Sequence, residues 1–368
     1  HEQLPYAMPF RIALLAPDGK EYPLKTDDAI LMHGDVLWLE KEVNEMVFRE
    51  IAEPPRLSLN RGFSAPVIIE CETIDYPFLM AFEKDGYVRY EAAHRFGIET
   101  LEAMMTGAEV NELYIRSYGA ILCDETIDAM FKSQILELPT ITTLMQRQEI
   151  IDVSVIVNAQ ERLKKVLAQR YVTELSNTIE ALYEPSNTHI DGESMGRRSL
   201  KNRLLGILMS LGEESISALC LRHYHESLSM SERLAALDLL ENYAPEAVSA
   251  ALDDFYTRYK EQTLVMNKYF ALCASSRRSG TLERVKALQN DPAYDNKVPN
   301  LVRALIGSFA RNPVAFYETS GEGFAFMADK VIEIDALNPQ IASGLAGKPA
   351  VPIMPAERTL YPFFSSSS

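Results

Sequence analysis

The chain has 368 residues, of which 47% are hydrophobic and 24% are charged, and its formal net charge is −16 at pH 7. These fractions are ordinary for a globular protein, and the length suggests two or three domains. The 52 acidic against 36 basic residues argue against nucleic-acid binding, which needs a basic surface. No segment approaches the ~20 consecutive apolar residues of a membrane-spanning helix, so we predict no membrane partner.

Two features of the sequence bear on the cellular compartment. The chain begins HEQLPYAMPF, with no initiator methionine and no secretory signal, so we expect a fragment or a processed product. Its four cysteines, Cys71, Cys123, Cys220 and Cys273, lie far apart beside apolar runs. They form no CxxC pair or zinc ribbon. The simplest interpretation is buried free thiols in a reducing compartment, which predicts a cytoplasmic protein.

The segment 1–75 is predicted to be a small β-sandwich. FRIALLAPDGKEYPL places two short apolar runs around the PDG sequence at 17–19, which is typical of a hairpin turn. Apolar residues flank the charged middle of DVLWLEKEVNEMVFREI, and a β-branched run lies at 67–69. The prolines at 54–55 and 66 suit strand edges or connections. The abrupt start of the chain suggests that the first strand is missing.

From Tyr76 onward the apolar period becomes helical. One long amphipathic helix is indicated by a stripe at Ile156, Ala159, Leu163, Val166, Leu167 and Tyr171. SMSERLAALDLL begins with Ser229 and has Glu232 three residues later, which predicts a capping box. Such helices follow one another by short connections, although no strict repeat is visible. The predicted fold class is therefore mainly α, with a large α-superhelix, an α-solenoid, over 76–346 after the β-sandwich.

The stretch VPNLVRALIGSFARNPVAFY, at 298–317, is predicted to be a helix that stops at a proline. Its apolar stripe is formed by Val302, Leu305, Ile306 and Phe309. Arg303 lies off this stripe, and Gly307 one turn later leaves space beside the guanidinium. From the residues alone, a surface or structural ion pair is the favoured interpretation of Arg303, and contact with a ligand is the alternative.

The sequence contains no complete catalytic or metal-binding motif. His223 and His225 are two residues apart and point in different directions on a helix, so they are not expected to share a metal. SGEGF at 320–324 is expected to be a loop before a helix. The basic cluster in GRRSLKNRLL is expected to be a solvated helix face with local ion pairs. Its members are Arg197, Arg198, Lys201 and Arg203. We therefore predict no catalytic residue and no metal ligand in this chain.

Several segments together resemble the C-terminal half of bacterial aminopeptidase N, a family of gluzincin-type zinc metallopeptidases. The similarity runs in order from about Pro9 to Ser343 and is carried by SLNRGFSAPV, RRSLKNRLL, SMSERLAALDLL, LVMNKYFALCASS, TLERVKAL, VRALIGSFARNPVAFY and GFAFMADKVIEIDALNPQIAS. The resemblance implies that the β-rich part is immunoglobulin-like and that a helical superhelix follows it. The GxMEN motif and the HExxH…E zinc motif of the family belong to the half that is missing, and neither occurs in this sequence.

The resemblance therefore implies a non-catalytic portion of an enzyme that removes N-terminal residues from short peptides. Zinc would belong to the parent enzyme, and the partners would be its N-terminal and catalytic domains and short peptides. The portion would shape and gate the peptide cavity. Arg303 matches a position at which the family's helical domain offers a basic side chain to substrate carboxylates. The family carries another arginine soon after NPQVAS, where this chain has Gly344, so a pair of arginines is not expected.

Beyond Ser343 the resemblance stops, and the tail at 347–368 is rich in proline and serine. A continuous helix is not expected there, because the prolines forbid one. If the final helices of the family are absent, the last helical pair would expose an apolar face and favour self-association. Two other hypotheses remain at this stage. The chain could be a free-standing α-solenoid that binds a peptide or protein, or the relic of a disrupted gene.

Overall fold

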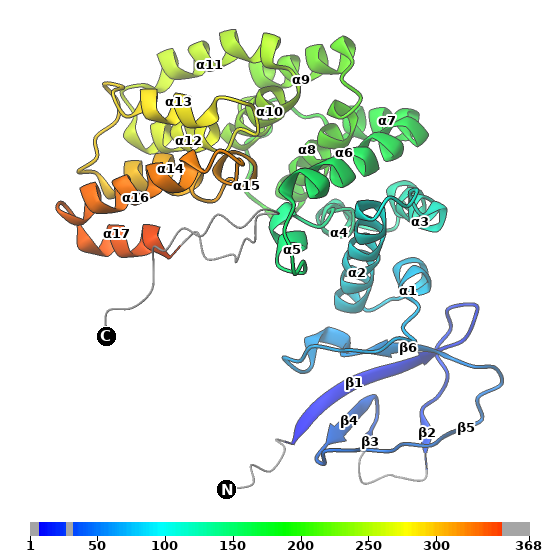
Figure 1. Ribbon diagram of the computed structural model, residues 1–368. Coiled ribbons are helices and arrows are strands. Elements are labelled where there is room, and N and C mark those ends of the chain that lie inside the picture. The colour runs from blue at the N-terminus through cyan, green and yellow to red at the C-terminus, as the bar shows by residue number, and fades with distance from the viewer. Residues whose placement is uncertain (1–6, 27–31, 348–368) are drawn as a thin grey trace, which may run out of the picture. The chain divides into compact units, whose positions relative to one another are not determined.

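The computed structural model describes residues 7–26 and 32–347 (Figure 1). The predicted tail at 347–368 thus lies, apart from its first residue, outside the described residues. The chain divides into two compact units, His1–Pro139 and Thr140–Ser368, and each is described by itself. Among the described residues, no helix combines the length and apolarity needed to cross a lipid bilayer.

Unit 1 begins with two small antiparallel sheets. A four-stranded sheet has the order β3-β4-β1-β6, and a second sheet pairs β2 with β5. Their bounds are β1 Met8–Leu15, β2 Lys25–Thr26, β3 Met32–His33, β4 Val36–Leu39, β5 Phe48–Arg49 and β6 Arg56–Leu59. The first half of β1 pairs with β4, and its second half pairs with β6. Because it pairs on both sides, β1 is an interior strand of the sheet. Its second half is buried throughout.

The strand predictions are partly right. The turn at 17–19 is present, because Gly19 has a φ of 81° and the Gly19 amide donates to the Ala16 carbonyl oxygen. Residues 67–69 form no strand, so that expectation is wrong. The chain leaves β6 through a tight turn at Asn60, and Pro66 then removes a backbone donor just before the β-branched run. Ile68 is consequently 83% exposed.

Among the described residues of unit 1, a short 3-10 helix covers Arg61–Phe63, and four α-helices follow from Tyr76. Their bounds are α1 Tyr76–Phe82, α2 Gly86–Met105, α3 Glu112–Cys123 and α4 Ala129–Ile135. Each starts after an Asp or Asn whose side chain accepts a hydrogen bond from a backbone amide of the first turn, which satisfies one of the amides left free at a helix start. The compact unit thus ends at Pro139, whereas a domain boundary near residue 75 remains a sequence-based prediction.

Unit 2 is a curved succession of helices, α5 to α17 (Figure 1). Their bounds are α5 Ile141–Met145, α6 Val153–Arg170, α7 Val172–Leu182, α8 Gly192–Met209, α9 Glu214–Glu226, α10 Met230–Tyr243, α11 Pro245–Tyr259, α12 Thr263–Ala274, α13 Thr281–Leu288, α14 Pro299–Phe309, α15 Pro313–Phe316, α16 Glu322–Asp335 and α17 Pro339–Ala346. Most contacts join helices that are close in sequence, as in repeat proteins. In addition, α15 contacts α6 near the start of the unit. The predicted mainly α class, with a small β region before a helical superhelix, is confirmed.

The predicted helix at 298–317 is present but shorter. Its stripe is buried, and Val302, Leu305 and Phe309 have no solvent exposure. The helix α14 ends at Phe309, because Asn312 accepts hydrogen bonds from two backbone amides and starts the short helix α15 at Pro313. The SGEGF segment is only partly the expected loop: Ser320 and the left-handed Gly321 precede the helix, and α16 already begins at Glu322 within the segment.

The close approach of α15 and α16 generates a prediction. A Cβ atom added at Gly323 would overlap the backbone carbonyl oxygen of Phe316, which has little freedom to move. We expect Gly323→Ala to lower the free energy of unfolding by about 1–3 kcal/mol through overpacking. Urea denaturation measures this change.

Gly344→Ala is the matched control, because nothing lies within 4 Å of the added Cβ on α17. Its better helix propensity should leave stability unchanged or raise it by up to about 1 kcal/mol. Equal destabilisation by the two substitutions would contradict the packing argument.

Candidate functional site

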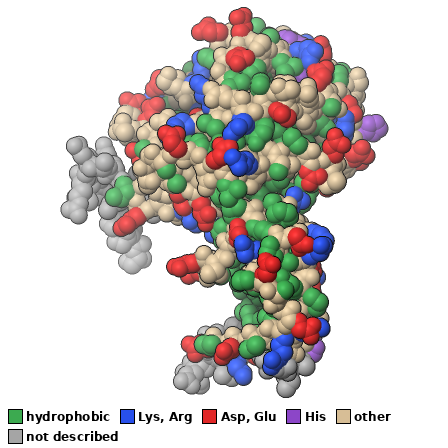
Figure 2. Space-filling view, turned by 90° about the vertical axis from the view of Figure 1, so that its right-hand side faces the viewer, with side chains coloured by type: hydrophobic (Ala, Val, Ile, Leu, Met, Phe, Trp, Pro, Cys, Tyr) green, Lys and Arg blue, Asp and Glu red, His purple; other side chains and the backbone are tan. Residues whose placement is uncertain are grey.

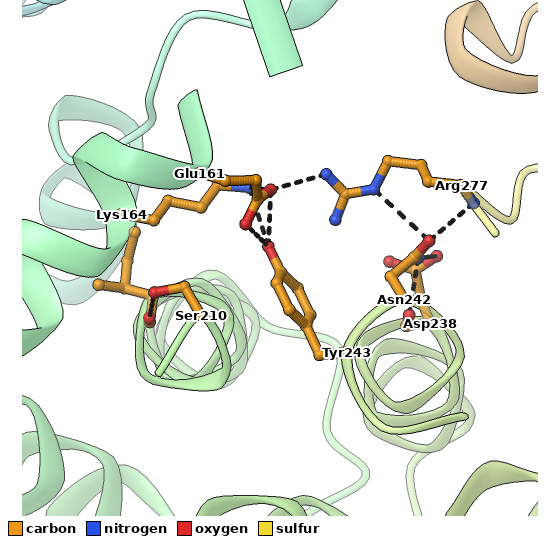
Figure 3. A network of polar contacts seen from close by, with 8 residues as sticks. Glu161, Lys164, Ser210, Asp238, Asn242, Tyr243 and Arg277 are labelled. Carbon is orange, nitrogen blue, oxygen red and sulfur yellow. Dashed lines mark hydrogen bonds and ion pairs between the residues drawn. The ribbon is translucent and has the colours of Figure 1, made fainter. Parts of the chain in front are cut away.

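A polar network in unit 2 is centred on the Glu161 carboxylate (Figure 3). Glu161 and Lys164 lie on one face of α6, and Lys164 Nζ is 2.9 Å from Glu161 Oε1. Tyr243, the last residue of α10, donates its hydroxyl to both carboxylate oxygens at 3.0 and 2.9 Å. Arg277, which follows α12, places Nη1 2.8 Å from Glu161 Oε1. One carboxylate therefore joins three segments that are far apart in sequence.

The Tyr243 ring supports both cations of this network. Arg277 Cζ lies 5.4 Å and Lys164 Nζ 5.8 Å from the ring centroid, distances at which a cation is attracted to an aromatic face. The Arg277 backbone amide also donates to Asn242 Oδ1 at 2.9 Å. The Asn242 side chain in turn donates to the Asp238 carbonyl oxygen at 2.8 Å on α10. We call these six residues, Glu161, Lys164, Asp238, Asn242, Tyr243 and Arg277, the Glu161 network.

Electrostatics keeps Glu161 ionised in this setting. Burial raises the pKa of its carboxyl group, but the nearby charges of Lys164 and Arg277 outweigh that cost, so the net pKa is lowered. Asp238 shows the opposite balance. Asp238 is exposed by its accessible surface, but the protein around its carboxyl group partly desolvates it and raises its pKa against the opposing charge of Arg277.

A second carboxylate extends the connection to α13. Glu241, on α10, is 1% exposed, and Arg284 Nη1 lies 2.6 Å from its Oε1 atom. Arg278 Nη1 is a more distant partner at 3.5 Å. Because Tyr243 of α10 donates to Glu161 on α6 and Glu241 of α10 binds Arg284 on α13, charge-assisted bonds join α10 to both α6 and α13.

The network offers no reactive arrangement. The Glu161 carboxylate is paired with Lys164 and Arg277, and the Asp238 carboxylate accepts a 3.3 Å hydrogen bond from the Asn242 amide. Among the described members of the network, no nucleophile lies beside a free base. Among residues 7–26 and 32–347, no three His, Cys, Asp or Glu side chains are grouped so that they could hold a metal ion. A catalytic zinc ion needs three protein ligands and an open position, so the described residues do not fit it. The network therefore has a structural role: its hydrogen bonds and ion pairs fix the helices that it joins relative to one another.

The basic cluster in GRRSLKNRLL is only partly as expected: Arg197 makes a local ion pair with Glu184 at 2.8 Å, but Lys201 does not belong to a solvated face. Lys201 is fully buried, and its Nζ atom lies 2.5 Å from Glu232 Oε1. Glu232 also accepts a 2.5 Å hydrogen bond from Ser227 Oγ, so the predicted capping box is wrong as well. The Ser229 side chain makes no cap hydrogen bond. Burial lowers the pKa of Lys201, although Glu232 opposes the shift.

The two histidines at 223 and 225 point in different directions, as expected. His223 is buried and stacks on Tyr183 with ring centroids 4.2 Å apart, whereas His225 is exposed. Burial and the adjacent Lys201 lower the pKa of His223 to about 3. The His223 imidazole is therefore neutral at physiological pH and serves packing.

The cysteine expectation is half right. Cys220 and Cys273 are buried, and burial raises the pKa of each thiol to about 12. Cys123, the last residue of α3, is exposed, and Cys71, in the loop before α1, is half-buried. All four are free thiols.

Arg303 is exposed on α14, off the buried stripe. Its Nη1 atom donates to Asn300 Oδ1 at 3.3 Å, one turn earlier on the same helix. This long, exposed hydrogen bond holds the side chain weakly. The structure does not bring Arg303 into the Glu161 network. On the face of unit 2 seen in Figure 2, acidic and basic side chains are interspersed.

Comparisons with known proteins cover nearly the whole chain. Residues 73–348 match the family model described as "Domain of unknown function (DUF3458_C) ARM repeats", and residues 1–72 match "Domain of unknown function (DUF3458) Ig-like fold". Aminopeptidase N of Escherichia coli (strain K12) is 29% identical over 94% of this chain and 40% of its own length. Aminopeptidase N of Caulobacter vibrioides is 29% identical over 91% of this chain and 38% of its own length.

A solved structure agrees with these sequence matches. The crystal structure of Legionella pneumophila aminopeptidase A in complex with aspartic acid has a TM-score of 0.82 and 26% identity. The match covers 93% of this chain and 41% of that chain. The present chain thus spans about two fifths of the length of the relatives it matches, in the part that corresponds to their C-terminal region.

The Glu161 network generates a stability prediction. We expect Glu161→Gln to lower the free energy of unfolding by about 1–3 kcal/mol at pH 7, because hydrogen bonds to an ionised group are lost. The pKa of Glu161 in the folded state is lowered below its ordinary value of 4.5. Its stabilising contribution is therefore complete above that value and is lost as the pH falls below it. Urea denaturation at pH 7 and at acidic pH measures both effects.

Glu180→Gln is the matched control. Glu180 is 66% exposed and pairs with Arg222 at 3.2 Å, and such surface pairs contribute about 0–1 kcal/mol. A loss of stability no larger for Glu161→Gln than for Glu180→Gln would show that the network does not hold the helices together.

Proposed function

The chain belongs to the family described as "Domain of unknown function (DUF3458_C) ARM repeats", and from this premise we propose that it forms the C-terminal, non-catalytic portion of an aminopeptidase N-like zinc metallopeptidase. The observation that carries the proposal is the match of 94% of this chain to 40% of the Escherichia coli aminopeptidase N. The remaining length of such a relative would hold the catalytic machinery, and its N-terminal and catalytic domains would be the partners of this portion.

The proposed role is to shape and gate a peptide cavity. A curved array of helices beside a catalytic cleft admits short peptides and excludes folded proteins, and this needs a fixed shape more than reactive groups. The Glu161 network and the contact of α15 with α6 support the role, because both fix the curvature of unit 2. When bound by the catalytic domain, zinc would supply an activated water for amide hydrolysis.

The alternative hypotheses are less well supported. Similarity to aminopeptidases in both the Ig-like and the ARM-repeat region favours a portion of such an enzyme over a free-standing scaffold. We also propose that the protein works in the reducing cytoplasm. The four free cysteines support that location, because disulfides are rare in such compartments.

Arg303 is proposed as a contact for the substrate carboxylate. Its guanidinium is exposed, and its hydrogen-bond partner within the described part of the chain is Asn300, at 3.3 Å, so the side chain can turn toward a ligand. A guanidinium binds a carboxylate through two parallel hydrogen bonds, which suits the C-terminus of a short peptide.

The activity itself is tested by comparing this chain with a protein that also contains the upstream coding region. We expect the chain alone to release no amino acid from short peptides. The longer protein should remove neutral or basic N-terminal residues. It should also bind about one zinc ion, because the upstream region would supply the three protein ligands of one catalytic site. An upstream region without zinc or hydrolytic activity would overturn the proposal.

Arg303→Ala, made in the longer protein, tests the substrate contact. We expect KM for tri- and tetrapeptides to rise about tenfold with kcat little changed, because a charge-assisted bond made in ground and transition states is lost. For peptides with an amidated C-terminus, which lack the carboxylate, Arg303→Ala should leave KM unchanged. Arg258→Ala is the control, since Arg258 pairs with Asp254 on its own helix. Unchanged kinetics for Arg303→Ala would exclude the contact.

A further inference from the structure

The turn at 60–64, between β6 and α1 in unit 1, holds a bulky aromatic residue in an unfavourable backbone conformation. Asn60, Gly62 and Phe63 have φ values of 60°, 62° and 53°. A left-handed φ is common for Gly and tolerated by Asn, but it is an outlier for Phe. Phe63 is nevertheless 54% exposed, so burial of its ring does not account for the conformation. Such strain concentrates at functional segments and persists only where neighbouring residues enforce it.

Buried polar side chains enforce this turn. Asn60 is 1% exposed, and its side chain binds both backbone groups of Ala65, at 2.8 Å to the amide and 2.9 Å to the carbonyl oxygen. Arg61 is 8% exposed and places Nη2 2.6 Å from Oε1 of the fully buried Glu83 side chain. The same nitrogen donates to Glu21 Oε1 at 2.8 Å. The residues on either side of Phe63 are therefore fixed, and its ring is held outward.

An apolar pocket adjoins this ring. The Phe63 ring lies 5.1 Å from that of Tyr87, which lines a pocket of about 50 Å³. One water takes up roughly 10–15 Å³ on the same measure, so the pocket has room for one small aliphatic side chain. Its wall is mostly apolar and includes Leu57, Val67, Ile69, Tyr76, Leu79 and Val88. Glu91 and Arg95, an ion pair at 2.7 Å, also line it. Hydrophobic side chains gather in patches on the face of unit 1 seen in Figure 2.

We propose that Phe63 and this pocket form the docking surface for the polypeptide segment that precedes this chain in the parent enzyme. The segment would cover the Phe63 ring and place an aliphatic side chain in the pocket. This inference rests on the proposed function, because that function supplies the preceding part of the enzyme. A fixed aromatic residue beside a pocket is typical of the residues that dominate the energy of protein interfaces.

The position of the N-terminal strand favours this occupant. The Arg11 amide, in β1, donates to Ser64 Oγ of the same turn at 2.8 Å. β1 begins at Met8, three residues earlier, and a strand advances about 3.4 Å per residue. Met8, the first residue of β1, therefore lies within roughly 10 Å of Arg11 and of the turn that Arg11 contacts. Such a tether gives the preceding segment a high effective concentration at the turn, which neither a second copy nor a free peptide has. The relatives, of which this chain covers about 40%, have enough additional length to supply it.

Photo-crosslinking in the longer protein tests the proposal directly. Benzoylphenylalanine is incorporated in place of Phe63 and, as a control, in place of Val43, which is 80% exposed elsewhere in unit 1. After irradiation, mass spectrometry should map the Phe63 crosslinks to residues upstream of this chain, with far fewer from position 43. Crosslinks confined to unit 2 or to a second copy, or no crosslink, would overturn the proposal.

A second variant separates docking from folding. Phe63→Gly suits the left-handed backbone and removes only the ring, so unit 1 should keep its fold. We expect upstream amides at the contact to exchange hydrogen at least tenfold faster in the longer protein, while the amides of α2 keep their protection. Unchanged upstream exchange would contradict docking. Both readouts are independent of hydrolysis, so an inactive enzyme with upstream crosslinks would refute only the proposed activity.

Discussion

The arrangement of unit 2 depends on the ionised Glu161 carboxylate. Repeat proteins are stabilised mainly by contacts between neighbouring repeats, so curvature is the sum of many small rotations. The Glu161–Arg277 ion pair is different, because it joins residues 116 positions apart. Together with the contact of α15 with α6, it links the start of the curve to its later helices. A carboxylate that binds a tyrosine hydroxyl and two cations is thus a constraint on shape rather than a reactive group.

Partly buried charges are a costly way to fix a shape, and the surroundings of Glu161 indicate how the cost is offset. Removing a carboxylate from water is unfavourable unless cations and hydrogen-bond donors replace the solvent. Glu161 has Lys164, Arg277 and the Tyr243 hydroxyl, and its side chain remains 30% exposed. The fully buried Lys201–Glu232 pair follows the same rule with Ser227 as an additional donor. Apolar contacts could stabilise these helices equally well, but paired charges also specify which residues meet.

The sequence predicted what depends on local pattern. The period of apolar residues revealed the helices, the buried stripe of α14 and the loop before α16, and the ordered segments pointed to the aminopeptidase family. It could not reveal pairings between distant residues. Glu161 lies on the polar side of an amphipathic helix, and Arg277 lies in a serine- and arginine-rich connection. Neither position differs locally from a solvated charge. Lys201 and Glu232 were misinterpreted for the same reason, because each has a plausible local role as a surface charge or a cap.

The double-mutant cycle of Glu161→Gln and Arg277→Met tests the central claim most directly, by urea denaturation at pH 7. If the carboxylate joins α6 to the segment after α12, the two substitutions should not be additive, with a coupling free energy of about 1 kcal/mol or more. Faster hydrogen exchange at the amides of α12 and α13 in either single variant would show that these helices are the ones that lose stability. If the two effects add within about 0.3–0.5 kcal/mol, the ion pair does not couple the two segments. Contacts between neighbouring helices would then be sufficient to determine the shape of unit 2.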